Sequence, residues 1–388
     1  MNLDALLQEK KILVCCGAGG VGKTTTAAAI AIRAAMLGQR TLVLTIDPAR
    51  RLANALGVSE FGNEVRAVPR RKFEKAGVPL KGELRAMMVD TKRTFDDLVE
   101  RFALNVEMRD AILGNPIYQQ LSETLSGSRE YMAMEKLFDL HSTEDADLIV
   151  LDTPPTRHAL DFLEAPDRIT AFLEGKVIHW LVKPYLMAGQ LGFKVFRKGT
   201  SSVFGVLEKV TGMEFLKDIS DFILSFEGMY DGFNQRAKRV KALLADRDTG
   251  FLLVTSPNRR LLDETVFFYN KLVEHKMHVD AVIVNKVHRP LAGSAAGPGG
   301  PLLSDQGRQE AAARMAEAAG FDGFRSTASK LLLNLARHQA MAERDSRNIE
   351  TLAGSLDRGV GLLSVPLFPL DVHDFDGLSL LNQHLFAA

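Results

Sequence analysis

A glycine-rich motif near the start of the chain has residue types and spacing suited to phosphate binding. Residues 17–24, GAGGVGKT, satisfy the pattern G-x-x-x-x-G-K-[ST]. An apolar run typical of a buried strand precedes it (11–16), and an alanine-rich run with helical spacing follows it (23–37). A strand, a glycine loop and a helix start direct several backbone N–H groups toward one anion. We expect Lys23 to reach the β- and γ-phosphates and the Thr24 hydroxyl to ligate Mg²⁺.

Polar residues at the ends of other apolar runs are further candidates. Asp47 follows TLVLTI, Asp152 ends DLIVLD, and Asn285 ends VDAVIVN. Asp152 stands where a P-loop enzyme places the carboxylate that holds Mg²⁺ or its waters. Asp47 is a second carboxylate that could face the γ-phosphate, and the Asn285 amide could read an adenine edge. Each of the three could instead be an ordinary turn or helix-capping residue.

Apolar runs that alternate with helix-like segments predict an α/β fold, with a mostly parallel sheet wrapped by helices. Ligands of such sheets bind beyond the carboxyl ends of the strands, where these polar residues lie. The expected strands are 11–16, 41–46, 84–90, 147–152, 251–255, 279–285 and 360–365. We predict a single domain of 388 residues, with a nucleotide-binding core (9–91, 146–167 and 248–388), an inserted α-helical subdomain (92–145 and 168–247) and a Gly/Pro-rich mobile loop (288–306).

Composition narrows the classes of partner. The net charge is zero, so nothing draws the whole chain toward nucleic acid. The first residues lack the regions of a signal peptide, and no apolar run is long enough for a transmembrane helix, so we expect a cytoplasmic protein. Cys15 and Cys16 are adjacent and should point to opposite faces of a strand. They are expected to be small buried residues, and this chain has no C-x-x-C pair for a zinc site.

Five segments in order resemble one family. GAGGVGKTTT, TIDPARRL, DTPPTRHAL, VNK and VPLFPLDV are similar to the P-loop, switch I, switch II, adenine-reading segment and C-terminal adenine loop of the ArsA/GET-pathway ATPases, within the deviant-Walker group of P-loop NTPases. Residues 118–140 further resemble a bacterial GET-like branch. The resemblance implies a dimeric ATPase that uses ATP/ADP and Mg²⁺ and hydrolyses ATP by in-line attack of water.

The resemblance also implies roles for particular residues. Asp47 would orient the attacking water, Lys23 would contact the phosphates, and Asp152 would lie near Mg²⁺ with Thr24. The implied phosphate-binding residues are Gly19, Gly20, Val21, Gly22, Lys23, Thr24 and Thr25, and the implied adenine-binding residues are Asn285, Pro366, Leu367 and Phe368.

Ala18 departs from the family pattern, which has a lysine there that reaches across a dimer interface to the partner's nucleotide. Three interpretations stay open. The chain pairs with a lysine-bearing paralogue, a homodimer uses another cation such as Arg50, Arg51 or Arg157, or hydrolysis is slow and the nucleotide acts as a structural switch. The first is favoured, because the bacterial GET-like branch includes paired subunits.

The use of ATP is a separate question. Residues 168–245 carry apolar residues at helical spacing, which suits either the core of a helical subdomain or a groove for a client's apolar helix. Two functions follow. One is an ATP-driven factor that handles membrane-protein clients or energises a membrane partner. The other is a nucleotide-gated scaffold with low turnover.

Overall fold

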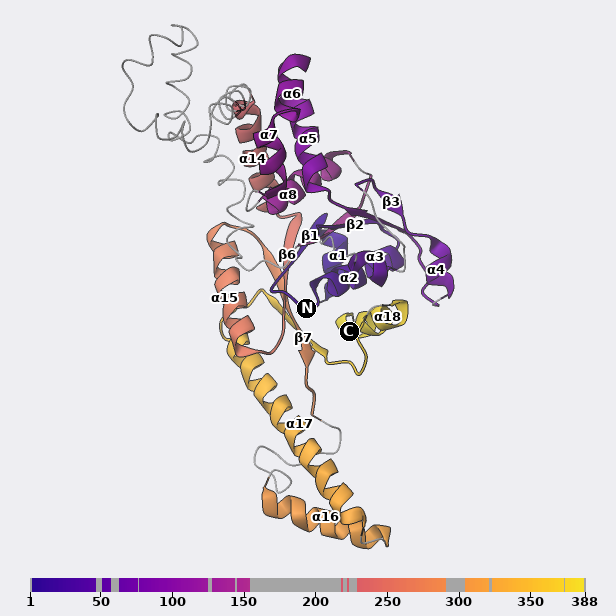
Figure 1. The fold of residues 1–388 in the computed structure, drawn as a ribbon. Coiled ribbons are helices and arrows are strands. Elements are labelled where there is room, and N and C mark those ends of the chain that lie inside the picture. Colours follow the sequence, from indigo (N-terminus) through magenta and orange to yellow (C-terminus); the bar gives the residue numbers. More distant parts are fainter. Residues whose placement is uncertain are drawn as a thin grey trace, which may run out of the picture.

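The computed structural model describes residues 2–46, 51–56, 63–75, 77–124, 128–143, 145–153, 218, 222, 229–290, 304–320, 323–372 and 374–386. Its centre is an eight-stranded sheet with the order β3-β4-β2-β5-β1-β6-β7-β8 (Figure 1). Neighbouring strands are parallel except β3 and β4. The strands are β1 (Ile12–Cys16), β2 (Arg40–Thr45), β3 (Arg66–Ala67), β4 (Glu83–Met88), β5 (Leu148–Asp152), β6 (Thr249–Thr255), β7 (Val279–Val287) and β8 (Gly361–Pro366).

Helices cover both faces of the sheet, and each face has its own apolar core. Leu13 and Cys15 of β1 lie in one core, whereas Val14 and Cys16 lie in the other. The first face carries α1 (Leu3–Glu9), α2 (Lys23–Leu37), α3 (Arg51–Ala55), α4 (Arg70–Lys75) and α18 (Phe375–Leu385). The second carries α5 (Thr91–Phe102), α6 (Val106–Leu113), α7 (Pro116–Thr124), α8 (Ser128–Thr143), α14 (Tyr230–Leu244), α15 (Arg259–Glu274) and α17 (Phe324–Ala353). The predicted α/β class, a mostly parallel sheet wrapped by helices, is confirmed.

The burial of the central strands on both faces explains why their sequences are continuous apolar runs. Every residue of β1, β5 and β6 is buried, as expected for strands covered on both faces. The parallel register sets Cys15 opposite Asp152 on one side and Leu252 on the other. The carboxyl ends of β1, β5 and β6 therefore meet at the same edge, where the glycine loop begins.

Helices α5–α8 and α14 lie together at one end of the sheet (Figure 1). A buried ion cluster joins α14 to α8. The Arg236 guanidinium donates to Glu135 Oε2 (Nε–O 2.7 Å) and also bonds Asp139, while the Tyr131 hydroxyl donates to Glu135 Oε1 at 2.6 Å. These helices fall within the expected helical subdomain, whose boundaries stay a prediction because residues 154–217 lie outside the described ranges.

Helix α16 (Asp305–Ala319) pairs with α17, and the pair extends away from the sheet (Figure 1). Ser304 caps α16, because its hydroxyl accepts from the Gly307 N–H at 3.0 Å. Residues 305 and 306 therefore belong to a helix and not to the expected mobile loop, of which residues 291–303 lie outside the described ranges. Among the helices in the described part of the chain, none has the length and apolar character needed to cross a bilayer.

Candidate functional site

The glycine loop connects the end of β1 to the start of α2, and its path depends on glycine. Gly17, Gly20 and Gly22 have φ values of 150°, 78° and 101°. A Cβ at Gly17 would lie less than 3.0 Å from the Val254 carbonyl, and one at Gly22 equally close to the Asn285 amide. The loop is thus packed against the ends of β6 and β7. Gly22 is the N-cap of α2, so Lys23 and Thr24 of the motif are the first two residues of that helix.

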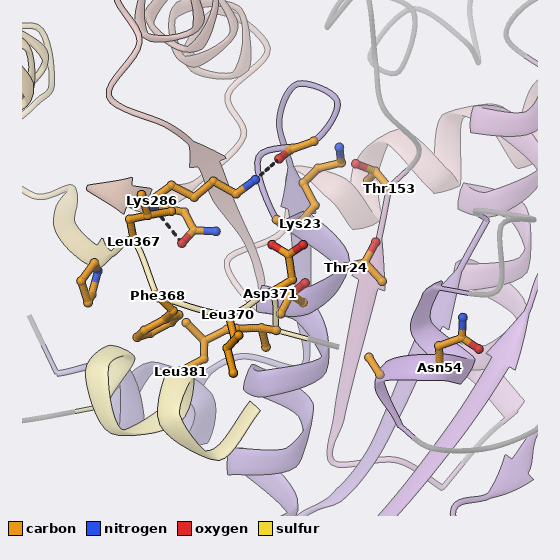
Figure 2. A pocket seen from close by; sticks show the side chains of 17 residues that line it. Lys23, Thr24, Asn54, Thr153, Lys286, Leu367, Phe368, Leu370, Asp371 and Leu381 are labelled. Carbon is orange, nitrogen blue, oxygen red and sulfur yellow. Dashed lines mark hydrogen bonds between the residues drawn. The ribbon is translucent and has the colours of Figure 1, made fainter. Parts of the chain in front are cut away.

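A cavity of about 420 Å³ opens beside this loop and brings together segments far apart in the sequence. Figure 2 shows Lys23 and Thr24 on one side, with Leu367, Phe368 and Leu370 across from them. Of the residues expected to bind nucleotide, those that line the cavity are Gly20, Gly22, Lys23, Thr24, Thr25, Asn285, Pro366, Leu367 and Phe368. A space of this volume is in the range of small-molecule sites.

Two of the expected phosphate-binding residues do not line the cavity. Val21 is buried, with its side chain against Gly17, and its carbonyl accepts from the Asn285 Nδ2 at 2.8 Å. Gly19 belongs to the turn of the loop. Lys23 is 6% exposed, and its Nζ donates to the Ala18 carbonyl at 2.9 Å. An ammonium group has three N–H donors, so this bond does not prevent Lys23 from contacting a bound phosphate.

The end of β5 places oxygen atoms near the loop. Asp152 is fully buried, and its Oδ2 accepts from the Thr45 hydroxyl at 2.9 Å. Asp152 does not line the cavity, but its neighbour Thr153 does, with its hydroxyl donating to the Cys15 carbonyl at 2.8 Å. Hydroxyl and carboxylate oxygens are the ligands that Mg²⁺ prefers. Thr24 lines the cavity and suits the expected metal, whereas the carboxylate of Asp152 is of the right type but does not line the cavity.

Several expected site residues lie outside the described ranges. These are Asp47, Arg50 and Arg157, together with the side chain of Arg51. Their roles stay predictions. The same holds for the parts that Lys23, Thr24, Asp152 and Asn285 are expected to play in nucleotide binding and hydrolysis.

The two cysteines lie beneath the loop in the sheet. Cys15 and Cys16 are both free and buried, and they face different cores as expected. Burial raises the pKa of Cys16 to about 12 and that of Cys15 well above its ordinary value. Both thiols are therefore protonated near neutrality, which makes them poor nucleophiles and poor ligands.

The sequence did not point to part of the cavity wall. Asn54, Thr153, Lys286, Leu370, Asp371, Val372 and Leu381 line it as well. Five of the seven stand inside motifs already singled out: Thr153 in the segment after β5, Lys286 in VNK, and Leu370, Asp371 and Val372 in VPLFPLDV. Leu381 comes from α18 and reaches the cavity only through packing of the fold.

Comparison with known proteins places the chain in a family. The sequence pattern of the anion-transporting ATPase family, ArsA, matches residues 10–290. The chain belongs to this family. The match spans the glycine loop, Asp152 and Asn285 and ends before Pro366, so it does not include the segment 366–368 on the far side of the cavity. The expected resemblance to the ArsA family is confirmed, and the chain is an ATPase.

Individual relatives agree with the family. The chain is 25% identical to the ATPase GET3 of Malassezia globosa over 297 residues, which are 76% of this chain and 78% of that protein. It is 26% identical to the ATPase get3 of Aspergillus terreus over 297 residues, with the same coverage. It is 25% identical to a putative arsenical pump-driving ATPase 1 of Aquifex aeolicus over 281 residues, 71% of this chain and 63% of that protein.

Proposed function

We propose that the chain binds Mg²⁺·ATP in the cavity of about 420 Å³ and hydrolyses it by in-line attack of water. The supporting observation is that one cavity joins the loop of residues 17–24 to Asn285 and to the segment 366–368. The triphosphate would lie along the loop N–H groups and the start of α2, whose dipole favours an anion. The base would lie toward Phe368 and Leu381.

We assign roles to the residues of this site as part of the proposal. Lys23 neutralises the β- and γ-phosphates with its ammonium group. Thr24 and Asp152 hold the metal ion or its waters, and Asp47 orients the attacking water. The metal, when bound, supplies positive charge that stabilises the transferring phosphoryl group. The contribution of the protein is mainly positioning and charge neutralisation.

We further propose that the chain works as a dimer with a lysine-bearing paralogue. Ala18 is the supporting observation, because this chain lacks the cation that the family places at that position. A cation supplied in trans can raise the rate of phosphoryl transfer by about 10³ to 10⁵. The partner would complete this chain's site.

The use of ATP is proposed to be the handling of apolar membrane-protein clients, or the driving of a membrane partner. One supporting observation is the similarity to the ATPase GET3 and to a putative arsenical pump-driving ATPase. The other is that apolar residues recur at helical spacing in residues 168–245. The absence of the lysine favours a second candidate, a nucleotide-gated scaffold with low turnover in the same heterodimer.

The test measures ATP turnover and native mass for the purified chain, alone and with the most similar lysine-bearing protein of its source. Lys23→Met is the matched inactive control. Turnover that appears only in the mixed dimer supports the proposed ATPase with a partner. A chain that does not bind Mg²⁺·ATP in either state would refute the proposed site. Full turnover by the chain alone would refute the need for a partner cation.

A further inference from the structure

Lys286 lines the cavity from the end of β7, and neither the sequence motifs nor the proposed function gives it a role. Its Nζ donates to the Gly20 carbonyl at 2.9 Å, as Figure 2 shows. The preceding residue, Asn285, bonds to the next carbonyl of the same loop: its Nδ2 donates to the Val21 carbonyl at 2.8 Å. Two consecutive residues of β7 thus hold two consecutive peptide groups of the glycine loop.

The planarity of the peptide group gives these bonds a consequence for phosphate binding. In a trans peptide, the carbonyl of one residue and the N–H of the next point in opposite directions within one rigid plane. A bond that holds the Gly20 carbonyl toward Lys286 directs the Val21 N–H away from it. The bond to the Val21 carbonyl does the same for the Gly22 N–H. Both N–H groups are thereby fixed before any anion arrives.

The backbone at Lys286 is unusual and supports the same arrangement. Its φ of 62° lies in the left-handed region, which is unfavourable for a lysine. In this conformation the Lys286 N–H donates to the Asn285 Oδ1 at 2.9 Å. The amide of Asn285 is therefore oriented at both ends, by Lys286 on one side and Val21 on the other. Such strain is a recurrent feature of functional sites.

Lys276 provides an instructive comparison. It is the other non-glycine residue with a positive φ in the described part of the chain, with a value of 60°. It follows the end of α15, where a left-handed residue is the ordinary way to terminate a helix. Lys286 follows no helix. It lies in β7 where the pairing with β8 shifts register, between Val284 and Val287, and in this conformation it makes its bonds to Asn285 and the loop.

We propose that Lys286 is a positioning residue which, with Asn285, fastens the glycine loop in its anion-binding form. The inference rests on the proposed function, because the loop is taken as the phosphate site. It also changes the view of Asn285. In this structure its amide holds the loop, whereas the sequence suggested that it reads the adenine edge. Because the loop contacts phosphates shared by ATP and ADP, Lys286 should strengthen binding of both nucleotides equally.

The test compares Lys286→Met, which keeps most of the apolar stem and removes the ammonium group, with Lys286→Arg, which keeps a donor. Equilibrium binding of Mg²⁺·ATP and Mg²⁺·ADP is measured by calorimetry, together with kcat. We expect Lys286→Met to bind both nucleotides about 3- to 10-fold more weakly, the loss expected for one hydrogen bond. We expect kcat to stay within about twofold and Lys286→Arg to recover most of the affinity.

Two controls separate the ammonium group from backbone strain. Lys276→Met removes the same kind of side chain from the same backbone conformation and should leave both affinities unchanged. Lys286→Gly relieves the strain but lacks the ammonium, so it should bind nucleotide as weakly as Lys286→Met. If Lys286→Gly or Lys286→Met binds both nucleotides as the wild type does, the inference is overturned. A fall in kcat with unchanged ADP affinity would also overturn it, since Lys286 would then act on the transferring phosphate.

One further readout separates this inference from the proposed function. Hydrogen exchange of the amides of residues 20–24 is measured in the nucleotide-free protein. Lys286→Met should speed this exchange at least about threefold relative to Lys276→Met. If wild type binds no nucleotide, the proposed function fails, and this exchange alone decides whether Lys286 holds the loop. Unchanged exchange would refute the fastening.

Discussion

Gly22→Ala is the substitution that tests most sharply how the loop is packed against β7. The φ of 101° at Gly22 costs an alanine about 1–2 kcal/mol of native-state strain. The added Cβ would also lie less than 3.0 Å from the Asn285 Nδ2, so the amide must move and lose its bond to the Val21 carbonyl. One hydrogen bond adds about 0.5–1.5 kcal/mol, and the expected loss of stability is about 1.5–3.5 kcal/mol.

Gly20→Ala is the matched control for this prediction. Gly20 also has a positive φ, 78°, but a Cβ there would meet nothing within 4 Å. It should lose only the strain, about 1–2 kcal/mol. The effect of alanine on the unfolded chain is the same at both positions and cancels in the comparison.

The assay is thermal unfolding without nucleotide. With an unfolding entropy of about 2.1 cal/mol/K per residue, 388 residues give a shift of about 1.2 °C for each kcal/mol. We expect Tm to fall by about 2–4 °C for Gly22→Ala and by about 1–2.5 °C for Gly20→Ala. In an Asn285→Ala background the two substitutions should cost the same. Equal costs in the wild-type background would refute the contact between Gly22 and Asn285.

Three further predictions concern other parts of the molecule. Arg236→Met leaves the carboxylate of Glu135, which is fully buried, without its guanidinium and should cost about 3–5 kcal/mol near neutrality in a urea titration. Burial already raises the pKa of Glu135 above its ordinary value, and loss of Arg236 raises it further. The loss of stability should therefore be smallest below about pH 4.5, where Glu135 is protonated in the unfolded chain as well, and should grow as the pH rises. A loss of stability independent of pH would contradict this account. Lys23→Met should abolish the stabilisation by Mg²⁺·ATP, which for wild type is about 2.7 kcal/mol at 100 times Kd, and an unchanged Tm shift on adding ATP would contradict its phosphate role. Cys15 and Cys16 should resist a thiol reagent in the native protein at neutral pH and react only after unfolding, whereas rapid native labelling would show that their burial is wrong.

Much of the fold was predictable from short sequence patterns. The run 11–16, the glycine loop and the helix after it were predictable because a buried parallel strand and a phosphate loop each have a short-range signature. The expected strands agree with β1, β2, β4, β5, β6, β7 and β8 to within about two residues at each end. The two-residue β3 carries no such pattern and depends on pairing with β4.

The site was predictable in part for a similar reason. The residues of the loop and the segment 366–368 could be named, since each belongs to a motif. The bonds from Asn285 and Lys286 to the loop could not, because they join residues more than 260 positions apart. Nor could the approach of Leu381, which depends on how α18 packs over α2.

The most direct test of the central claim, one nucleotide site formed by segments far apart in the sequence, is hydrogen exchange with and without Mg²⁺·ATP. The account predicts that ATP protects residues 17–25 and residues 366–372 together, in the wild type and not in Lys23→Met. Protection of the loop alone would contradict the proposed base site toward Phe368. No protection of either segment would contradict the nucleotide site itself.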